Sequence, residues 1–255
     1  MRLLARIILF ILVVTAVVAV VAWTCPADIA YRWFFASRLG PVALTGLSGT
    51  IWQGHAVSMR VFDRELGQLD WHVQALPLLK GDWVAQINIA GTDTKALATL
   101  TCSADRQLDI RDATIQLPAS VLEPAIGIPD LHMLGQIEIS LTRARLRGAW
   151  IESANGNALW RDAAVAGAAQ ARLSDLRATF VSMPDGSIAG ELRDLGGPLL
   201  ADGMFKTVAG AYEAELRLAP RDGDAHVLDA LQHVGQAQAD GSVLLKIRGQ
   251  LIKVF

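Results

Sequence analysis

The sequence predicts a mainly β protein: an N-terminal transmembrane helix followed by a curled antiparallel β-sheet, half-barrel or sandwich-like, with a few short helices. An apolar run, interrupted only by Thr15, occupies residues 7–23. Apolar and polar residues then alternate with period two, which is typical of strands with one apolar and one wet face. Asp-Gly and Asn-Gly pairs recur in this region and are typical of tight hairpins.

The apolar run is long enough to cross a bilayer, because about 17 residues of helix extend roughly 26 Å. Its length and the position of Trp23, where an interfacial anchor lies, favour an uncleaved signal-anchor. Cleavage as a signal peptide stays open, since residues 20–22, Val-Val-Ala, are a tolerable cleavage site. Lipidation at Cys25 is disfavoured, because Trp23 and Thr24 are poor residues before a lipidated cysteine.

Flanking charges bear on the orientation of this segment in the membrane but do not decide it. Arg2 and Arg6 precede the run and favour a cytoplasmic N-terminus, whereas Arg32 and Arg38 follow it, so the positive-inside count is close to a tie. Long domains cross a membrane largely regardless of charge, which places the body in the periplasm. We expect a cytoplasmic N-terminus over residues 1–6 and a transmembrane signal-anchor helix over residues 7–23. A membrane-proximal helix or linker over residues 24–40 and a periplasmic antiparallel β domain over residues 41–255 are expected to follow.

Period-two alternation locates the clearest strands of the body. The segments are residues 69–74, 83–89, 136–141, 212–218 and 243–248. Helical patterns are short, and we expect them at residues 27–39, 75–79, 118–126 and 226–234, while the alanine-rich residues 163–171 favour strand or loop. The expected hairpin turns are Asn155-Gly156, Asp185-Gly186, Asp202-Gly203, Asp222-Gly223 and Asp240-Gly241.

A weak internal repeat raises the alternative of two β units. Residues 49–52, Gly-Thr-Ile-Trp, resemble residues 156–160, Gly-Asn-Ala-Leu-Trp. Two related units, residues 41–150 and 151–255, would explain the match, and chance is the competing explanation because the match is short.

Charge and cysteine content restrict the classes of partner. The formal net charge is −2, so there is no electrostatic case for nucleic acid. The chain has two cysteines, Cys25 and Cys102. A disulfide is chemically allowed in the periplasm, but two unpaired thiols are favoured, because Cys25 lies at the membrane exit and Cys102 in an expected strand.

We find no residues that form a convincing catalytic, cofactor-binding or metal site, and we expect no enzyme and no cofactor. Residues 46–49, Gly-Leu-Ser-Gly, resemble a nucleophile elbow, but they lack the final glycine and lead into a strand, which favours a simple turn. The histidines form no close pair of the kind that metal sites use. They are His55, His72, His132, His226 and His233.

Two further groups of residues leave structural and functional interpretations open. Arg143, Arg145 and Arg147 form an alternating row, which favours a solvated sheet edge that resists edge-to-edge pairing over a docking patch for a partner or anionic headgroups. For the tryptophans in or beside strands, core packing is favoured over lining a groove for an apolar ligand or partner. These are Trp52, Trp71, Trp83, Trp150 and Trp160.

A series of short motifs resembles the type II secretion system protein N family, also called general secretion pathway protein N. After the N-terminal span, the motifs lie at residues 47–56, 69–73, 76–81, 156–160, 195–199 and 240–249. The resemblance covers essentially the whole chain. It implies a Gram-negative inner-membrane protein with a periplasmic β-rich domain, an accessory structural or assembly subunit that contacts other type II secretion subunits and supports secretion across the outer membrane, with no catalytic residues.

An alternative function follows from the question of what covers the apolar face of the sheet. A curled sheet with an apolar groove is the form expected of a membrane-tethered lipid-binding or lipid-transfer protein, similar to the AsmA-like group. Contact with inner-membrane lipid is expected through residues 7–23 in either case. Other small-molecule ligands are not expected, while a lipid ligand stays open.

Overall fold

The computed structural model describes residues 24–35, 42–61, 64–103, 105, 107–123, 130–147, 150–167, 170–208, 211–231 and 235–250. The strands are β1 (Val42–Gly49), β2 (Gln53–Val61), β3 (Arg64–Gln74), β4 (Trp83–Ala90), β5 (Lys95–Cys102), β6 (Gln107–Pro118), β7 (Leu131–Arg147), β8 (Trp150–Gly167), β9 (Ala171–Ser182), β10 (Ile188–Asp194), β11 (Leu199–Val208), β12 (Ala211–Pro220), β13 (Gln236–Ala237) and β14 (Val243–Gln250). The helical segments are α2 (Ala27–Ala30), η1 (Tyr31–Phe35), η2 (Leu76–Lys80), η3 (Ala119–Leu122), η4 (Arg221–Gly223) and α4 (Ala225–Leu231).

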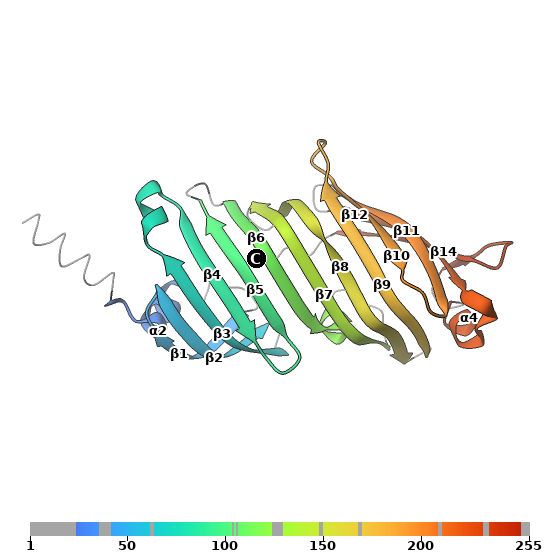
Figure 1. The fold of residues 1–255 in the computed structure, drawn as a ribbon, viewed down its shortest axis with the longest axis horizontal. Helices are drawn as coiled ribbons and strands as arrows, with labels where there is room; N and C mark the ends of the chain where they lie inside the picture. The colour runs from blue at the N-terminus through green and yellow to red at the C-terminus, as the bar shows by residue number, and fades with distance from the viewer. Residues whose placement is uncertain are drawn as a thin grey trace, which may run out of the picture.

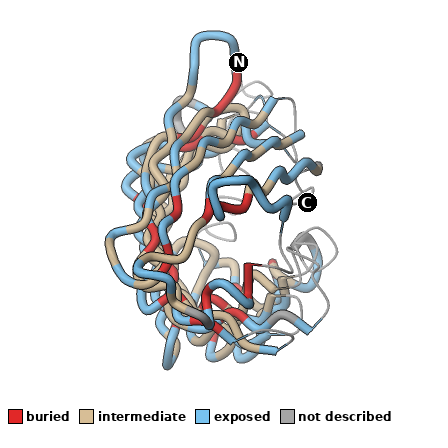
Figure 2. Tube along the Cα trace, turned by 90° about the vertical axis from the view of Figure 1, so that its right-hand side faces the viewer, coloured by how far each residue is buried: buried red, intermediate tan, exposed pale blue. Residues whose placement is uncertain are grey.

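The described strands form one antiparallel sheet of 14 strands that does not close on itself (Figure 1). Each strand pairs with the next one along the chain, except that β14 lies between β12 and β13. Seen end-on, the sheet bends into an arc that is open on one side (Figure 2). The half-barrel form of the prediction therefore describes the sheet, and the sandwich-like form does not, because all described strands belong to a single sheet.

The segments predicted at the N-terminus are only partly described. Residues 1–6 and the predicted transmembrane helix, residues 7–23, lie outside the described residues. Among the residues that the structure describes, no helix is long and apolar enough to cross a membrane.

The predicted short helices are found where the chain is described. α2 and η1 lie in the predicted segment 27–39, η2 in 75–79, η3 in 118–126 and α4 in 226–234, each within a few residues of the expected bounds. The alanine-rich segment 163–171 contributes the end of β8 and the start of β9, as favoured from the sequence.

Period-two alternation produces one apolar and one polar face across the whole sheet. Residues that lie opposite each other on paired strands share a face, as Trp71 and Ile87 do on β3 and β4. The same register continues to the far end, where Leu216 lies opposite Leu245. We call this surface the apolar face; its larger members are Trp71, Ile87, Leu100, Ile110, Ile139, Trp160, Phe180, Leu192, Phe205, Leu216 and Leu245.

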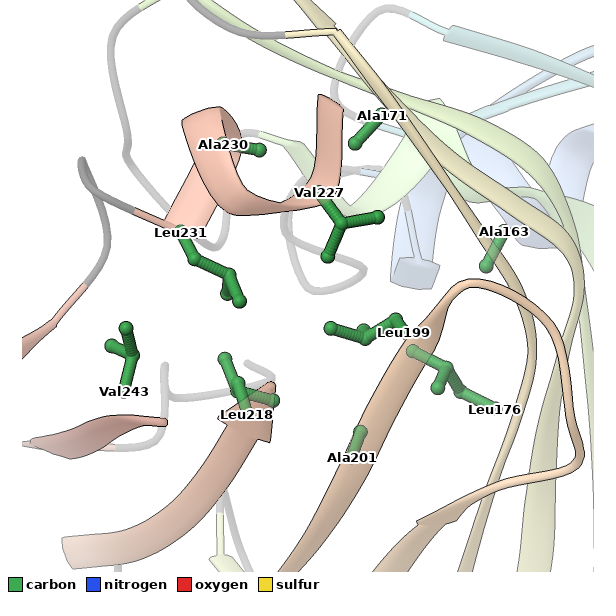
Figure 3. Packing of buried hydrophobic residues seen from close by; sticks show 10 residues of the cluster. All are labelled: Ala163, Ala171, Leu176, Leu199, Ala201, Leu218, Val227, Ala230, Leu231 and Val243. Atoms are coloured by element: carbon green, nitrogen blue, oxygen red, sulfur yellow. The ribbon is translucent and has the colours of Figure 1, made fainter. Parts of the chain in front are cut away.

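The largest buried cluster lies at the C-terminal end of the apolar face. There α4 packs Val227, Ala230 and Leu231 against the sheet, and Val227 is only 1% exposed (Figure 3). The sheet side of this cluster is made by Ala163, Ala171, Leu176, Leu199, Ala201, Leu218 and Val243. Burial of these side chains fixes α4 on the sheet, because each fully buried aliphatic side chain stabilises by about 1.5–3 kcal/mol.

Two of the five predicted hairpin turns are confirmed. Asp185-Gly186 joins β9 to β10, and Asp240-Gly241 joins β13 to β14, while Asp222-Gly223 lies in η4 before α4. The prediction at Asp222-Gly223 is wrong because this pair joins no two strands, and the two remaining predictions are wrong because Asn155-Gly156 lies inside β8 and Asp202-Gly203 inside β11. These glycines allow a close approach instead: a Cβ on Gly156 would lie 2.2 Å from the Ser140 carbonyl oxygen, and one on Gly203 would lie 2.5 Å from that of Glu215.

The two proposed β units lie within one continuous sheet. β7 and β8 pair across the proposed boundary, with Arg147 opposite Trp150. The repeated motifs differ in local structure, since residues 49–52 form the turn region between β1 and β2 and residues 156–160 lie within β8. The relationship between residues 41–150 and 151–255 stays a prediction.

The Asp185 carboxylate of the β9–β10 hairpin provides a test of this turn. It accepts hydrogen bonds from the Ser187 hydroxyl, the Lys206 ammonium group and the Ser187 backbone N–H, in that order of effect, and these hold the pKa of Asp185 well below its ordinary value. A carboxyl group whose pKa is lowered by folding stabilises the fold above its unfolded pKa, and this contribution is lost as the pH falls through the folded pKa. We expect Ser187→Ala to raise the pKa of Asp185 in an NMR titration, with Asp240 as an unchanged control. An unaltered Asp185 titration would contradict this account.

Candidate interaction surface

The side chains considered for chemistry do not converge on a site among the described residues. The Nδ1 atom of His55 lies 2.8 Å from Asp70, and that of His132 lies 3.9 Å from Glu123. No group of three or more potential metal ligands occurs in the described part of the chain. His72 lies in β3, His226 in α4 and Ser48 in β1, while His233 lies outside the described residues. The surfaces of the sheet are therefore the candidate sites for function.

The apolar face runs along the described sheet from β3 to β14. Along the middle of the sheet its large side chains, among them Leu100, Ile110, Ile139 and Phe180, are half-buried rather than buried. Within the described residues, short helical segments cover it at its two ends, through α2 with η1 and through α4, and η3 packs beside Met133 and Ile137. An apolar surface of this extent is typical of a site for a partner or ligand.

At the N-terminal end, the apolar face contains a hollow of about 630 Å³ over β1 to β4. Trp71 donates its Nε1–H to the Thr50 carbonyl oxygen at 3.2 Å, so the polar atom of this ring is satisfied. We call this cavity the N-terminal hollow. It is lined by Cys25, Ala27, Ala30, Tyr31, Leu44, Leu47, Ile51, Leu69, Trp71, Val73, Trp83, Ala85 and Ile87.

Aromatic rings shape the wall of the N-terminal hollow. Trp83 stacks on Trp52 with ring centroids 6.4 Å apart and an interplanar angle of 12°. Trp71 lies over Gly54, where a Cβ atom would be 2.2 Å from the Trp71 ring. A side chain at Gly54 would therefore displace Trp71, which explains why the sheet has a glycine at this point.

The segment of residues 24–35 contributes the other wall through Cys25, Ala27, Ala30 and Tyr31, and it is tied to β1. Ala27 and Ala30 are buried. Tyr31 accepts a hydrogen bond through its hydroxyl from the backbone N–H of Leu44 at 3.1 Å, and Ile51 donates its N–H to the Cys25 carbonyl oxygen at 3.2 Å. These contacts hold a segment that directly follows the predicted membrane span against the sheet.

The tryptophans divide between the two interpretations made from the sequence. Trp160 packs against two of the buried clusters and donates its Nε1–H to the Leu134 carbonyl oxygen at 2.8 Å, as core packing predicts. Trp71 and Trp83 line the N-terminal hollow, and Trp83 is 47% exposed, which agrees with the alternative interpretation of a groove lining. Trp150 is also exposed.

The arginine row lies on the polar face, but the prediction that it marks a sheet edge is wrong. β7, which carries it, is paired with β6 on one side and β8 on the other. Arg143 and Arg145 lie 3.8 and 3.3 Å from Asp109, and Arg147 lies 3.0 Å from Glu152. Alternation identifies residues that share a face, and it does not distinguish a central strand from an edge strand.

Ion pairs of this kind extend across the polar face. Arg161 lies 2.7 Å from Glu138, and the hydrogen bond and charge of Glu138 raise the pKa of Arg161. Towards the C-terminus, Lys246 pairs with Glu215 and Arg248 with Glu213. Exposed pairs contribute little stability each. Their alternating signs make the polar face a poor candidate for a charged docking patch.

The last strand has an open edge among the described residues. β14 pairs with β12 over residues 243–250, whereas β13 covers only Val243 and Leu244. An uncovered strand edge can accept an additional strand from a partner.

The two cysteines do not pair, since Cys25 and Cys102 are both free thiols.

Comparison with known proteins decides the family. The family model described as "Type II secretion system (T2SS), protein N" matches residues 40–246, a range that contains strands β1 to β13 and part of β14. The chain belongs to the type II secretion system protein N family. The resemblance inferred from the short motifs is thereby confirmed.

A curated member of the protein N family supports the assignment over a shorter range. Type II secretion system protein N from Vibrio cholerae serotype O1 (strain ATCC 39315 / El Tor Inaba N16961) is 29% identical over 123 residues, which are 46% of this chain and 48% of the relative. The match thus spans about half the length of that relative. No solved structure matches the chain.

Proposed function

We propose that this protein is an accessory structural or assembly subunit of the type II secretion system. The observation that carries the proposal is the family match over residues 40–246, which covers nearly all of the sheet. The edge of β14, which the described residues cover only at Val243 and Leu244, and the half-exposed apolar face supply surfaces that other secretion subunits can bind. No catalytic step is part of this role.

The proposed organisation follows from the sequence. Residues 7–23 are an uncleaved anchor in the inner membrane, residues 1–6 are cytoplasmic, and residues 24–40 connect the anchor to a periplasmic β domain of residues 41–255. The contacts of Tyr31 with β1 support this organisation, since they hold residues 24–35, directly after the proposed anchor, against the sheet.

Deletion of the chain should impair secretion through the type II system. We expect secreted hydrolases to accumulate in the periplasm, and the full chain supplied in trans to restore their release. A variant in which a cleavable signal peptide replaces residues 1–23 should restore it poorly, because the β domain is then no longer held at the membrane. Normal secretion in the deletion strain, under conditions in which loss of another secretion subunit stops release, would contradict the proposal.

The continuous apolar face favours a second candidate function, that of a membrane-tethered lipid-binding or lipid-transfer protein. Half-exposed apolar side chains run from β3 to β14 on one face, which is more apolar surface than a single docking strand requires. Deletion would then leave secretion normal and change the lipid composition of the outer membrane. Impaired secretion with unchanged lipids would exclude this candidate.

A further inference from the structure

We propose that the N-terminal hollow holds one acyl chain of a lipid from the membrane that residues 7–23 enter. The inference rests on the proposed anchoring by residues 7–23, and it goes beyond the role of a secretion subunit. The proposed occupant of the hollow is a membrane lipid. The alternative occupant is a segment of protein, and the experiment below distinguishes the two.

The hollow lies directly after the predicted membrane span in the chain. Cys25 lines the hollow immediately beyond Thr24, where the described chain begins after the apolar run. If residues 7–23 span the bilayer, the hollow adjoins the bilayer surface, because only Thr24 lies between this segment and Cys25.

The outer side of the same short segment is the second argument. Ile29 and Trp33 are four residues apart, and they are 47% and 80% exposed, although Ala27 and Ala30 of this segment are buried. Residues four apart on a helical segment share a side. Exposed tryptophan next to a membrane span is typical of the bilayer interface. Residues 24–35 therefore have one side suited to the membrane surface and the other side forming the wall of the hollow.

The wall of the hollow suits an acyl chain better than a peptide, because it offers few polar partners. The Nε1–H of Trp71 is donated to Thr50, and the Tyr31 hydroxyl already accepts from Leu44. The remaining wall is almost entirely aliphatic or aromatic. A peptide would bring backbone N–H and C=O groups that need partners, and burying them unpaired is unfavourable. An acyl chain carries no such groups.

The volume of the hollow also favours a lipid tail as its occupant. The volume of about 630 Å³ lies within the range of about 300–1,000 Å³ that is usual for small-molecule sites. A helix made from the apolar run would need roughly 2,000 Å³, for a cylinder about 26 Å long and about 10 Å wide. The run itself is therefore too large to fill the hollow, whereas a single lipid tail is of the appropriate scale.

Photo-crosslinking of the full chain tests this inference. The protein is placed in nanodiscs of phosphatidylethanolamine that carries a diazirine on one acyl chain, and crosslinked peptides are mapped by mass spectrometry. We expect label in residues 69–73 and 83–87, which line the hollow, in addition to residues 7–23. Label in residues 7–23 alone would overturn the inference and leave the anchor and the secretion role intact. Absence of label in residues 7–23 would instead contradict the proposed anchoring, on which the inference rests.

Variants that fill the hollow make the test specific. Ala85→Phe places a large ring in the hollow and should lower the label in residues 69–73 and 83–87 about tenfold, which corresponds to the loss of roughly two buried methylene groups. Ala158→Phe is the matched control, because Ala158 is also half-buried on the apolar face but lies on β8, outside the hollow. Equal labelling in both variants would overturn the inference.

A second variant tests the hollow without introducing a large side chain. Val73→Thr keeps the size of a wall residue and adds a hydroxyl group, so it should lower the label severalfold without filling the hollow. The inference would also be overturned if Val73→Thr left the label unchanged and Ala85→Phe gave a folded protein that was still fully labelled. Secretion is measured separately in each variant, so that a loss of secretion is not confused with a loss of lipid contact.

Discussion

Replacing Val227 with aspartate should lower the free energy of unfolding by about 3–5 kcal/mol, because it buries an unpaired charge. Val227 is 1% exposed and faces Leu199 and Leu218 from α4 (Figure 3). The carboxylate can leave this environment only if α4 separates from the sheet. Urea unfolding followed by circular dichroism measures the loss, and binding of a hydrophobic dye should increase as the C-terminal end of the apolar face is exposed.

Leu228→Asp is the matched control for this experiment. Leu228 is the next residue of α4 and is 44% exposed, so the same charge stays in water. We expect a change within about 0.5 kcal/mol, as for surface substitutions in general. Equal destabilisation by the two variants would mean that α4 does not pack on the sheet through Val227.

Replacing Gly156 with alanine should separate the two longest strands of the sheet. The added Cβ would lie 2.2 Å from the Ser140 carbonyl oxygen and 3.1 Å from the Leu141 Cα, both in the β7 backbone. Backbone cannot move aside as a flexible side chain can, so we expect a loss near the upper end of the usual 1–3 kcal/mol for overpacking. The midpoint of urea unfolding measures this change.

Gly186→Ala is the comparison for the effect of removing a glycine in general. No atom lies within 4 Å of the position that its Cβ would take, although the residue has a φ of +79°. We expect a loss of about 1 kcal/mol from the positive φ alone. If Gly156→Ala costs no more than Gly186→Ala, the close approach of β7 and β8 does not limit stability.

Local patterns in the sequence account for some of the strands and for the short helical segments of the fold. Alternation along residues 69–74 and 243–248 predicted strands β3 and β14, and the short helical patterns predicted η2, η3 and α4. These signals are local, because the side-chain direction of a strand repeats every two residues whatever the strand is paired with. The same alternation placed Arg143, Arg145 and Arg147 on one face.

Local patterns did not show how those elements lie against one another. Alternation did not reveal that β7 is a central strand, and an Asn-Gly pair looked the same at a turn as at Gly156, where two backbones approach closely. The neighbours of a strand depend on residues far along the chain, which period and turn chemistry do not record.

The N-terminal hollow is the clearest case of this difference. The alternating patterns of residues 69–74 and 83–89 show its β3 and β4 residues as apolar, and a groove lining is one of the two interpretations of the tryptophans. Trp71 from β3, Trp83 from β4 and Tyr31 from the segment after the N-terminal apolar run come together in the hollow only when the sheet is assembled. The sequence sufficed for the kind of protein, a mainly β member of the protein N family, because period and motif are properties of the chain itself. The hollow required folding, because a cavity is a relation between side chains that the chain brings together from separate segments.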